Sequence, residues 1–199
     1  MSSRMGQNKA FLAFKGKPLI LWVYGALSRV FDQVFVVGPR EAGELLQVKS
    51  YPDLQGGDRP SSIRGIFTGL AASPTLYTFF APCDMPFLDP AALREMRESL
   101  PRDCDAYVPR RGEYWQPLHA LYSKNCLPAI ERQIKEKNFK IMDFYDKVRT
   151  CTKDMQYLED MKPEVPLFLN INTSADLEEA EAAASRVQAW RESPGYGRR

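Results

Sequence analysis

Short apolar runs alternate with segments of helical character through the first half of the chain. The runs VFVVG at residues 34–38 and LYTFFAPCD at residues 76–84 have the length and composition of buried strands. The segments at residues 62–73 and 88–100 have the length and composition of helices. Strands separated by helices of about ten to fifteen residues require crossover connections, which place parallel strands in a sheet covered on both faces. The sequence therefore predicts a Rossmann-like α/β fold, a three-layer sandwich with a mostly parallel sheet.

The second half is less regular but adds elements of the same kind. A last helix is predicted to begin at the capping pattern Thr173-x-x-Asp176 and to run to about Trp190. The chain contains no long linker, so we expect one domain over residues 1–192 and a disordered tail over residues 193–199. Further strands are predicted at residues 106–110, 114–123 and 167–173, and an amphipathic helix at residues 127–137.

The composition of the chain narrows its expected partners and cellular compartment. Its 27 basic and 25 acidic residues give a net charge of +2, which is too small a field to predict nucleic acid or an anionic membrane as the main partner. Apolar runs stay below the roughly 18 residues of a membrane span, and we expect a cytoplasmic protein. The four cysteines are too far apart for a C-x-x-C pair, so we expect reduced thiols.

Polar residues follow several of the predicted strands. Ligands of open α/β sheets bind at the carboxyl ends of the strands, which selects Asp53, Asp84, Asn170 and Asn172 as candidates. Asp84 stands before a proline turn, where a carboxylate either binds Mg²⁺ together with nucleotide phosphates or caps the turn. Asn170 and Asn172 are two apart on a predicted strand, so both amides are expected on one face.

The hexapeptide RMGQNK at residues 4–9 is a candidate phosphate-binding loop. Gly6 has no Cβ, so backbone N–H groups there can approach a phosphate closely. Arg4 and Lys9 flank this glycine with positive charge, and Lys9 can act as a compact point charge on a polyphosphate. The alternative is a solvated turn near the end of the chain.

Two further features allow a structural interpretation. Gly65 and Gly69 lie four apart on one face of a predicted helix, where they either permit close packing or contact a nucleotide. His119 lies between apolar residues in a predicted strand, so we expect a hydrogen-bonded core or cleft residue rather than a catalyst.

Five motifs follow one another along the chain: SSRMGQNKAFLAFKGKPLI at residues 2–20, GIFTGLAA at 65–72, APCDMPFL at 81–88, QPLHALY at 116–122 and FLNINTSADLEEAE at 168–181. Taken in order, they resemble the motifs of the nucleotidyltransferases that act on the molybdenum cofactor, and more broadly of the Rossmann-like sugar-1-phosphate nucleotidyltransferases. The resemblance covers nearly the whole chain and implies a molybdenum cofactor guanylyltransferase. Such an enzyme transfers GMP from GTP to the terminal phosphate of molybdopterin, with Mg²⁺ and with release of pyrophosphate.

The resemblance also implies roles for individual residues. Lys9 and Asp84 would be the catalytic residues, with Lys9 on the GTP phosphates and Asp84 on Mg²⁺. The phosphate nucleophile is already anionic near neutral pH, so no general base is required. Other residues would bind the nucleotide or the pterin: Arg4 and Gly6 at the phosphate loop, Asp53 at the nucleotide site, and Asn170 and Asn172 at the pterin.

The nucleotide and the partners follow from the same resemblance. The pattern Asn-x-Asn-Thr at residues 170–173 and the Gly65-x-x-x-Gly69-Leu70 pattern resemble the guanylyl rather than the cytidylyl enzymes. The expected partners are GTP and the molybdenum cofactor, with transient contact to cofactor-inserting proteins or target molybdoenzymes. Two alternatives stay open: a cytidylyl or other nucleotidyltransferase of the same fold, and a degenerate module that binds the cofactor without transfer.

The chain departs from the family pattern at its beginning. In the family a buried apolar strand precedes the Arg-Met-Gly loop, whereas only three residues precede Arg4 here. We expect the first strand to be missing, through a start placed too far downstream with about a dozen residues absent, or through a genuine short form with lost activity. A missing central strand would expose the hydrogen-bonding edges of both neighbouring strands.

Overall fold

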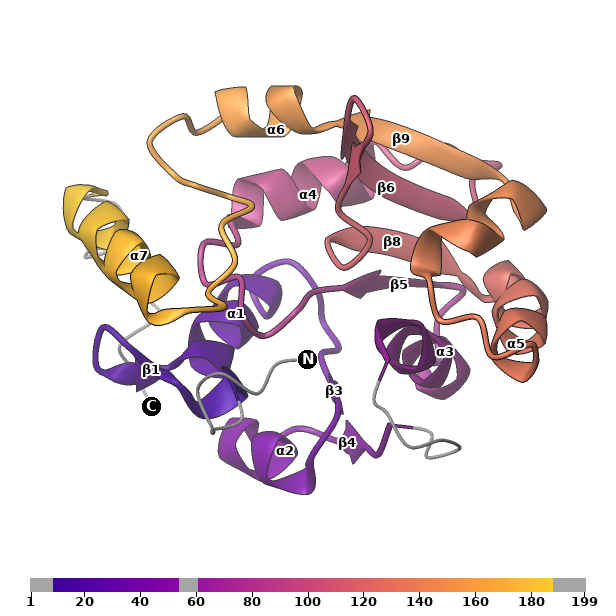
Figure 1. The fold of residues 1–199 in the computed structure, drawn as a ribbon, viewed down its shortest axis with the longest axis horizontal. Coiled ribbons are helices and arrows are strands. Elements are labelled where there is room, and N and C mark those ends of the chain that lie inside the picture. Colours follow the sequence, from indigo (N-terminus) through magenta and orange to yellow (C-terminus); the bar gives the residue numbers. More distant parts are fainter. Residues whose placement is uncertain (1–8, 54–60, 188–199) are drawn as a thin grey trace. The chain divides into compact units, whose positions relative to one another are not determined.

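The computed structural model describes residues 9–53 and 61–187 of the chain (Figure 1). The chain divides into two compact units. Unit 1 comprises residues 1–33, 82–94 and 156–199, and unit 2 comprises residues 34–81 and 95–155. None of the helices in the described part of the chain has both the length and the apolar character needed to cross a membrane.

Unit 1 begins with a short β-hairpin that leads into a helix. After the 3-10 helix η1 (Lys9–Phe11), strands β1 (Ala13–Phe14) and β2 (Lys17–Pro18) pair antiparallel. Lys15 and Gly16 form the turn with φ angles of 47° and 76°, the left-handed backbone that favours glycine in a two-residue hairpin turn. Helix α1 (Leu19–Leu27) begins directly after Pro18, as the sequence predicts.

Aromatic packing holds this hairpin in unit 1. The buried ring of Phe14 makes edge contacts with Trp22 of α1 and with Phe87, each with ring centroids 5.8 Å apart. The indole Nε1 of Trp22 donates a hydrogen bond of 2.9 Å to the backbone carbonyl of Phe14. The loop that contains Phe87 is therefore fixed against the hairpin that directly follows Lys9 and η1.

Two predicted helix starts are confirmed. The Asp89 carboxylate accepts hydrogen bonds from the backbone N–H groups of Ala91 and Ala92, at 2.8 and 3.2 Å, and caps α4 (Pro90–Glu98). Thr173 and Asp176 form the predicted capping box of α7 (Ser174–Arg186). The predicted end of this helix near residue 190 and the predicted tail at residues 193–199 lie outside the described residues. A further short helix, α6, spans Met155–Asp160.

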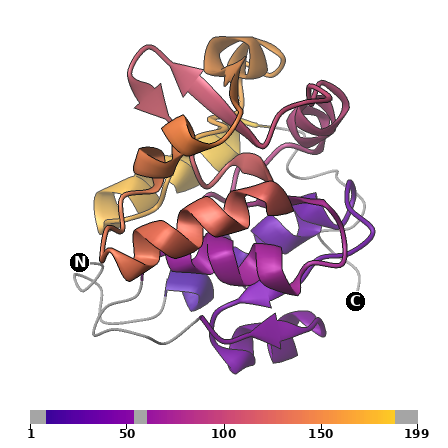
Figure 2. The same ribbon diagram turned by 90° about the vertical axis from the view of Figure 1, so that its right-hand side faces the viewer.

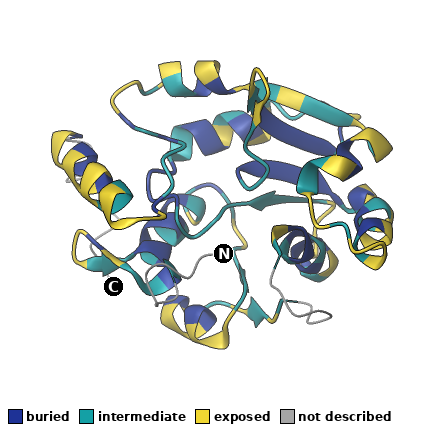
Figure 3. Cartoon of the chain, viewed as in Figure 1, coloured by how far each residue is buried: buried dark blue, intermediate teal, exposed yellow. Residues whose placement is uncertain are grey.

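Unit 2 contains a mixed five-stranded sheet in the order β5-β8-β6-β7, with β9 on the other side of β6. The pairs β5–β8, β6–β8 and β6–β7 are antiparallel, and β6–β9 is parallel. Strand β8 and most of β6 are buried (Figure 3). The strands are β5 (Tyr77–Phe80), β6 (Ala106–Arg111), β7 (Tyr114–Trp115), β8 (Ala120–Ser123) and β9 (Thr150–Asp154).

Helices pack on these strands, and the predicted α/β class is confirmed. Helices α3 and α5 lie side by side (Figure 2), and the buried residues Ile66, Tyr122 and Ile130 belong to one apolar core. A short parallel pair, β3 and β4, contacts α3. The elements are α2 (Arg40–Leu46), α3 (Ser62–Ala72), α5 (Leu127–Lys135), β3 (Val36–Val37), β4 (Ser50–Tyr51) and the 3-10 helices η2 (Lys124–Cys126) and η3 (Ile141–Lys147).

Gly69 permits the close approach of α3 to the strands. A Cβ atom at this position would lie 2.6 Å from Cε1 of Phe80 in β5 and 3.5 Å from Cγ2 of Val37 in β3. The packing interpretation of Gly69 is therefore confirmed. A Cβ atom at Gly65 would meet no atom within 4 Å, so packing does not explain this glycine.

Strands β3 and β5, which both contact α3, are not paired with each other. Within the described ranges, β3 is hydrogen-bonded only to β4, and β5 is hydrogen-bonded only to β8. Both strands thus have one edge without a ladder partner among the described residues.

Two predicted strands are wrong in part. Residues 167–173 do not form a strand, because their N–H groups are used in local turns: Leu167 donates to Val165 at 2.9 Å and Leu169 to Pro166 at 3.0 Å. The predicted single strand at residues 114–123 is split into β7 and β8. Pro117 interrupts it because proline has no N–H for a ladder hydrogen bond.

Candidate functional site

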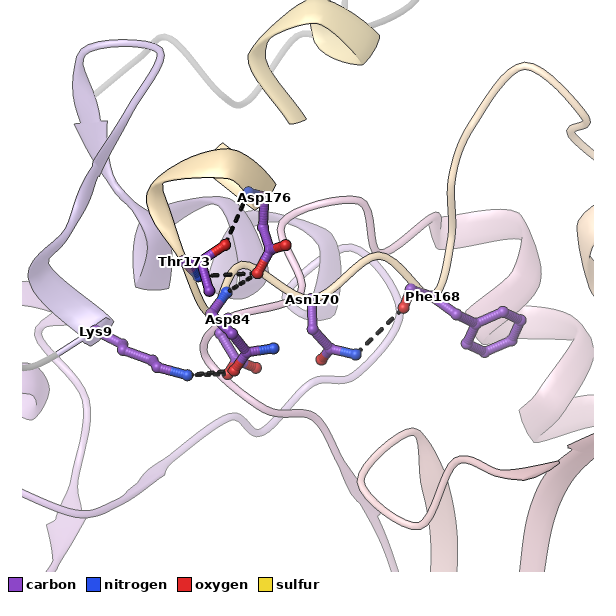
Figure 4. Close-up of polar contacts among 7 residues, drawn as sticks. Lys9, Asp84, Phe168, Asn170, Thr173 and Asp176 are labelled. Atoms are coloured by element: carbon purple, nitrogen blue, oxygen red, sulfur yellow. Dashed lines mark hydrogen bonds and ion pairs between the residues drawn. The ribbon is translucent and has the colours of Figure 1, made fainter. Parts of the chain in front are cut away.

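Lys9, Asp84 and Asn172 meet in unit 1, although they are far apart in the sequence. Figure 4 shows the Lys9 side chain directed at Asp84. The Lys9 Nζ lies 3.3 Å from Oδ2 of Asp84 and also donates a hydrogen bond to Oδ1 of Asn172. The side chains of Lys9 and Asp84 are 20% and 19% exposed. A partly accessible cation is thus held between a carboxylate and an amide oxygen.

The backbone explains why these residues meet. Lys9 opens η1 directly before the hairpin that packs on Phe87, and Asp84 lies in the loop that contains Phe87. The backbone carbonyl of Asp84 accepts a hydrogen bond of 2.8 Å from the N–H of Ile171, which is buried. This bond places the segment that carries Asn172 beside the Asp84 loop.

Asn170 and Asn172 have different surroundings, because their segment is not a strand. The amide nitrogen of Asn170 donates to the carbonyl of Phe168 at 3.3 Å, and this residue is half-buried. Asn172 is exposed and contacts Lys9 through its side-chain oxygen. The expectation that both amides lie on one face of a strand is therefore wrong, and only Asn172 contacts the Lys9–Asp84 pair.

The thiol next to Asp84 is not a nucleophile. Burial, reinforced by the neighbouring Asp84 carboxylate, raises the pKa of Cys83 to about 11. The thiol is therefore neutral near pH 7, and only the thiolate attacks. The groups of this site can bind and orient charged oxygens, which is what a direct phosphoryl transfer requires.

The residues around Asp84 fit a magnesium ion that takes most of its ligands from a substrate. The described ranges contain no group of three or more His, Cys, Asp or Glu side chains able to hold a metal ion. Asp84 is a half-buried carboxylate with a side chain that is accessible from solvent. Mg²⁺ is typically bound by one or two carboxylates, substrate phosphates and water, so one carboxylate at this position is compatible with it.

The structure does not place the other three predicted site residues relative to this site. Asp53 is half-buried after β4 and belongs to unit 2, whereas Lys9, Asp84, Asn170 and Asn172 belong to unit 1. Arg4 and Gly6 lie outside the described residues.

Sequence reasoning missed one residue at this site. Asp176 accepts a hydrogen bond from the backbone N–H of Asn172 as well as from Thr173, both at 2.8 Å (Figure 4). The two backbone N–H groups hold the pKa of Asp176 below its usual range. The capping pattern predicts only the Thr173 contact, so no sequence signal pointed to the contact with Asn172.

The fold and these residues define an α/β nucleotidyltransferase, and three comparisons agree. Residues 1–150 match the model of the MobA-like NTP transferase domain. The chain belongs to this family.

Individual relatives extend the match over nearly the whole chain. A protein of Pelotomaculum thermopropionicum named "Probable molybdenum cofactor guanylyltransferase" is 36% identical over 191 residues, which cover 96% of this chain and 92% of that protein. A molybdenum cofactor guanylyltransferase of Desulfosudis oleivorans is 32% identical over 89% of this chain and 88% of its own. The crystal structure of molybdopterin-guanine dinucleotide biosynthesis protein A from Archaeoglobus fulgidus has a TM-score of 0.79 at 29% identity and covers 94% of this chain and 95% of its own.

Proposed function

We propose that this protein transfers GMP from GTP to the terminal phosphate of the molybdopterin-type molybdenum cofactor and releases pyrophosphate. The observation that supports the proposal is the contact of Lys9 with Asp84 and Asn172, which joins a cation, a carboxylate and an amide from three motifs. Family membership and the names of the relatives support the same reaction and favour GTP over CTP.

In the proposed reaction Lys9 acts on the phosphates of GTP. Its Nζ already has two acceptors in Asp84 and Asn172, which hold the cation in one place and leave its third N–H for a phosphate oxygen. Attack by the cofactor's phosphate on the α-phosphorus moves negative charge toward the leaving pyrophosphate. A fixed cation stabilises this charge without reorganisation at the moment of reaction.

Asp84 is the proposed magnesium ligand. When bound, Mg²⁺ would neutralise charge on the phosphate oxygens and help to align the displacement. The carboxylate of Asp84 would bind the Mg²⁺ ion, while the ammonium group of Lys9 would contact the phosphates of GTP. Asn170 and Asn172 are proposed to bind the pterin substrate, and Arg4, Gly6 and Asp53 to bind GTP.

The compartment and the protein partners are part of the same proposal. All four cysteines are free thiols, which suits a reducing cytoplasm. The product would pass by transient contact to cofactor-inserting proteins or to target molybdoenzymes.

The test is an assay of pyrophosphate release and dinucleotide formation with Mg²⁺, the molybdenum cofactor, and either GTP or CTP. We expect product with GTP, and a loss of about 100-fold or more in kcat for Lys9→Met and for Asp84→Asn. Lys15→Met and Glu178→Gln are matched controls, because Lys15 contacts Ser185 on the same unit and Glu178 is an exposed residue of α7. Full activity of either site variant, or product with CTP alone, would contradict the proposal.

A further inference from the structure

Asp176 makes one contact more than its capping box requires. In a capping box the side chain at the third helical residue accepts from the N–H of the N-cap residue, here Thr173. Oδ2 of Asp176 also accepts from the N–H of Asn172, one residue further upstream, and both distances are 2.8 Å. The carboxylate therefore fixes the backbone of a residue outside the helix.

The fixed residue is the one that contacts Lys9. Asn172 is exposed, so packing does not hold its side chain, and hydrogen bonds must do so. The preceding residue, Ile171, is buried, and its N–H donates to the carbonyl of Asp84. The backbone N–H of Asn172 itself donates to the carboxylate of Asp176. Its side-chain oxygen then accepts from Lys9. The contacts form a continuous chain from the first turn of α7 to the lysine.

We propose that Asp176 is a positioning residue of this site: by holding the backbone of Asn172 it keeps the amide oxygen of Asn172, and through it the Lys9 ammonium group, directed at the phosphates. The inference rests on the proposed function. Asp176 acts through Asn172 and has no contact of its own with the substrates in this account.

A purely structural role makes a different prediction, and Thr173 provides the control. Oγ1 of Thr173 accepts from the backbone N–H of Asp176 at 3.2 Å, which is the other half of the capping box. Thr173→Ala removes this cap but keeps the backbone N–H groups that Asp176 binds. Asp176→Ala removes both contacts to those N–H groups. If Asp176 only stabilises α7, the two variants should have similar activities.

The experiment compares kcat/KM for the full chain and three variants in the GMP-transfer assay. We expect a loss of about tenfold to 100-fold for Asp176→Ala, the size of effect that a misplaced catalytic group produces. Thr173→Ala should stay within about twofold of the wild-type chain. Asp176→Asn keeps an acceptor oxygen in nearly the same place and should retain most of the activity. A loss in Asp176→Asn as large as in Asp176→Ala would overturn the positional account.

A double-mutant cycle with Asn172 separates positioning from helix stabilisation, because a role of Asp176 in the stability of α7 alone would not make its effect on the rate depend on Asn172. If Asp176 acts through Asn172, the variant Asn172→Ala/Asp176→Ala should be no slower than Asn172→Ala. Effects of the two substitutions that multiply would overturn the inference. Thermal unfolding of each variant separates a loss of folded protein from a loss of rate.

The two proposals fail in different ways. A wild-type chain that transfers no GMP would contradict the proposed function. The contact would then be tested by the exchange of the Asn172 amide proton, followed by NMR. Faster exchange in Asp176→Ala but not in Thr173→Ala would support the positioning contact, and equal exchange in all three proteins would overturn it.

Discussion

The two glycines of α3 allow a stability prediction in which one helix supplies its own control. Alanine in place of either glycine gains helix propensity, about 1 kcal/mol in each case. At Gly69 the new Cβ would lie 2.6 and 2.8 Å from Cε1 and Cζ of Phe80, closer than side-chain carbons approach one another. The Phe80 ring has little room to move away, because it makes an edge contact with Tyr122 at a centroid distance of 5.8 Å.

The size of the effect follows from the difference between the two sites. Overpacking of this kind costs about 1–3 kcal/mol, whereas the Cβ at Gly65 would meet no atom within 4 Å. Since the gain in propensity is common to both, Gly69→Ala should be less stable than Gly65→Ala by about 1–3 kcal/mol. In a chain of this length about 1 kcal/mol shifts Tm by roughly 2–4 °C.

The assay is urea unfolding of the wild-type chain and the two variants, followed by circular dichroism. We expect Gly65→Ala to be at least as stable as the wild-type chain and Gly69→Ala to be the least stable of the three. Equal free energies of unfolding for the two variants would refute the packing argument. Activity of Gly65→Ala separately tests nucleotide contact at that glycine, because a loss of transfer in a stable protein cannot come from packing.

Two further predictions concern buried polar groups of unit 2. Burial lowers the pKa of His119 to about 4 from an ordinary 6.5. Between these two pH values the imidazole is protonated in the unfolded chain and neutral in the folded chain, so a falling pH favours unfolding. The free energy of unfolding should therefore fall by roughly 2 kcal/mol between pH 6.5 and pH 5. In urea titrations of His119→Phe this pH dependence should be absent, and a variant with the pH dependence of the wild-type chain would contradict the assignment to His119. The Tyr122 hydroxyl donates to the Pro117 carbonyl and meets the Tyr145 hydroxyl, both at 2.8 Å, so Tyr122→Phe leaves two groups without this partner and Tyr145→Phe leaves one. We expect Tyr122→Phe to cost about 1–3 kcal/mol and Tyr145→Phe less, and the reverse order in thermal unfolding would contradict this assignment.

Features encoded in nearby residues were predictable from the sequence. Pro18 and Asp89 mark helix starts by their own backbone and side-chain chemistry, and the capping box at Thr173 does the same. The motif residues Lys9 and Asp84 were selected without knowledge of their distance, and the structure brings them to 3.3 Å. That approach depends on the packing of Phe14 on Phe87, which no local pattern reveals.

Features that depend on tertiary contacts were not predictable. Residues 167–173 have the apolar composition of a strand, yet the carbonyls of Val165 and Pro166 accept the N–H groups of Leu167 and Leu169 in two local turns. The N–H of Ile171 binds the Asp84 carbonyl instead of a neighbouring strand. The β-propensity of a residue describes its preference for extended backbone, but it does not determine which group accepts a hydrogen bond from its backbone N–H. The contact of Asp176 with Asn172 was missed for the same reason.

The Lys9–Asp84 pair is poorly suited to a stabilising role, and this bears on its function. Both side chains are about one-fifth exposed, and accessible ion pairs contribute roughly 0–1 kcal/mol because water screens the charges and ordering two side chains costs entropy. A contribution to folding is therefore a weak reason for a lysine and an aspartate 75 residues apart to be held at 3.3 Å. The pair also leaves the site with no net charge from these two groups before the nucleotide arrives. A triphosphate that binds with its metal ion then brings an anion to Lys9 and a cation to Asp84, so neither charge of the pair is left uncompensated. Because little folding energy depends on the pair, Lys9→Met and Asp84→Asn should unfold near the wild-type midpoint, so that a loss of transfer in these variants reports on chemistry.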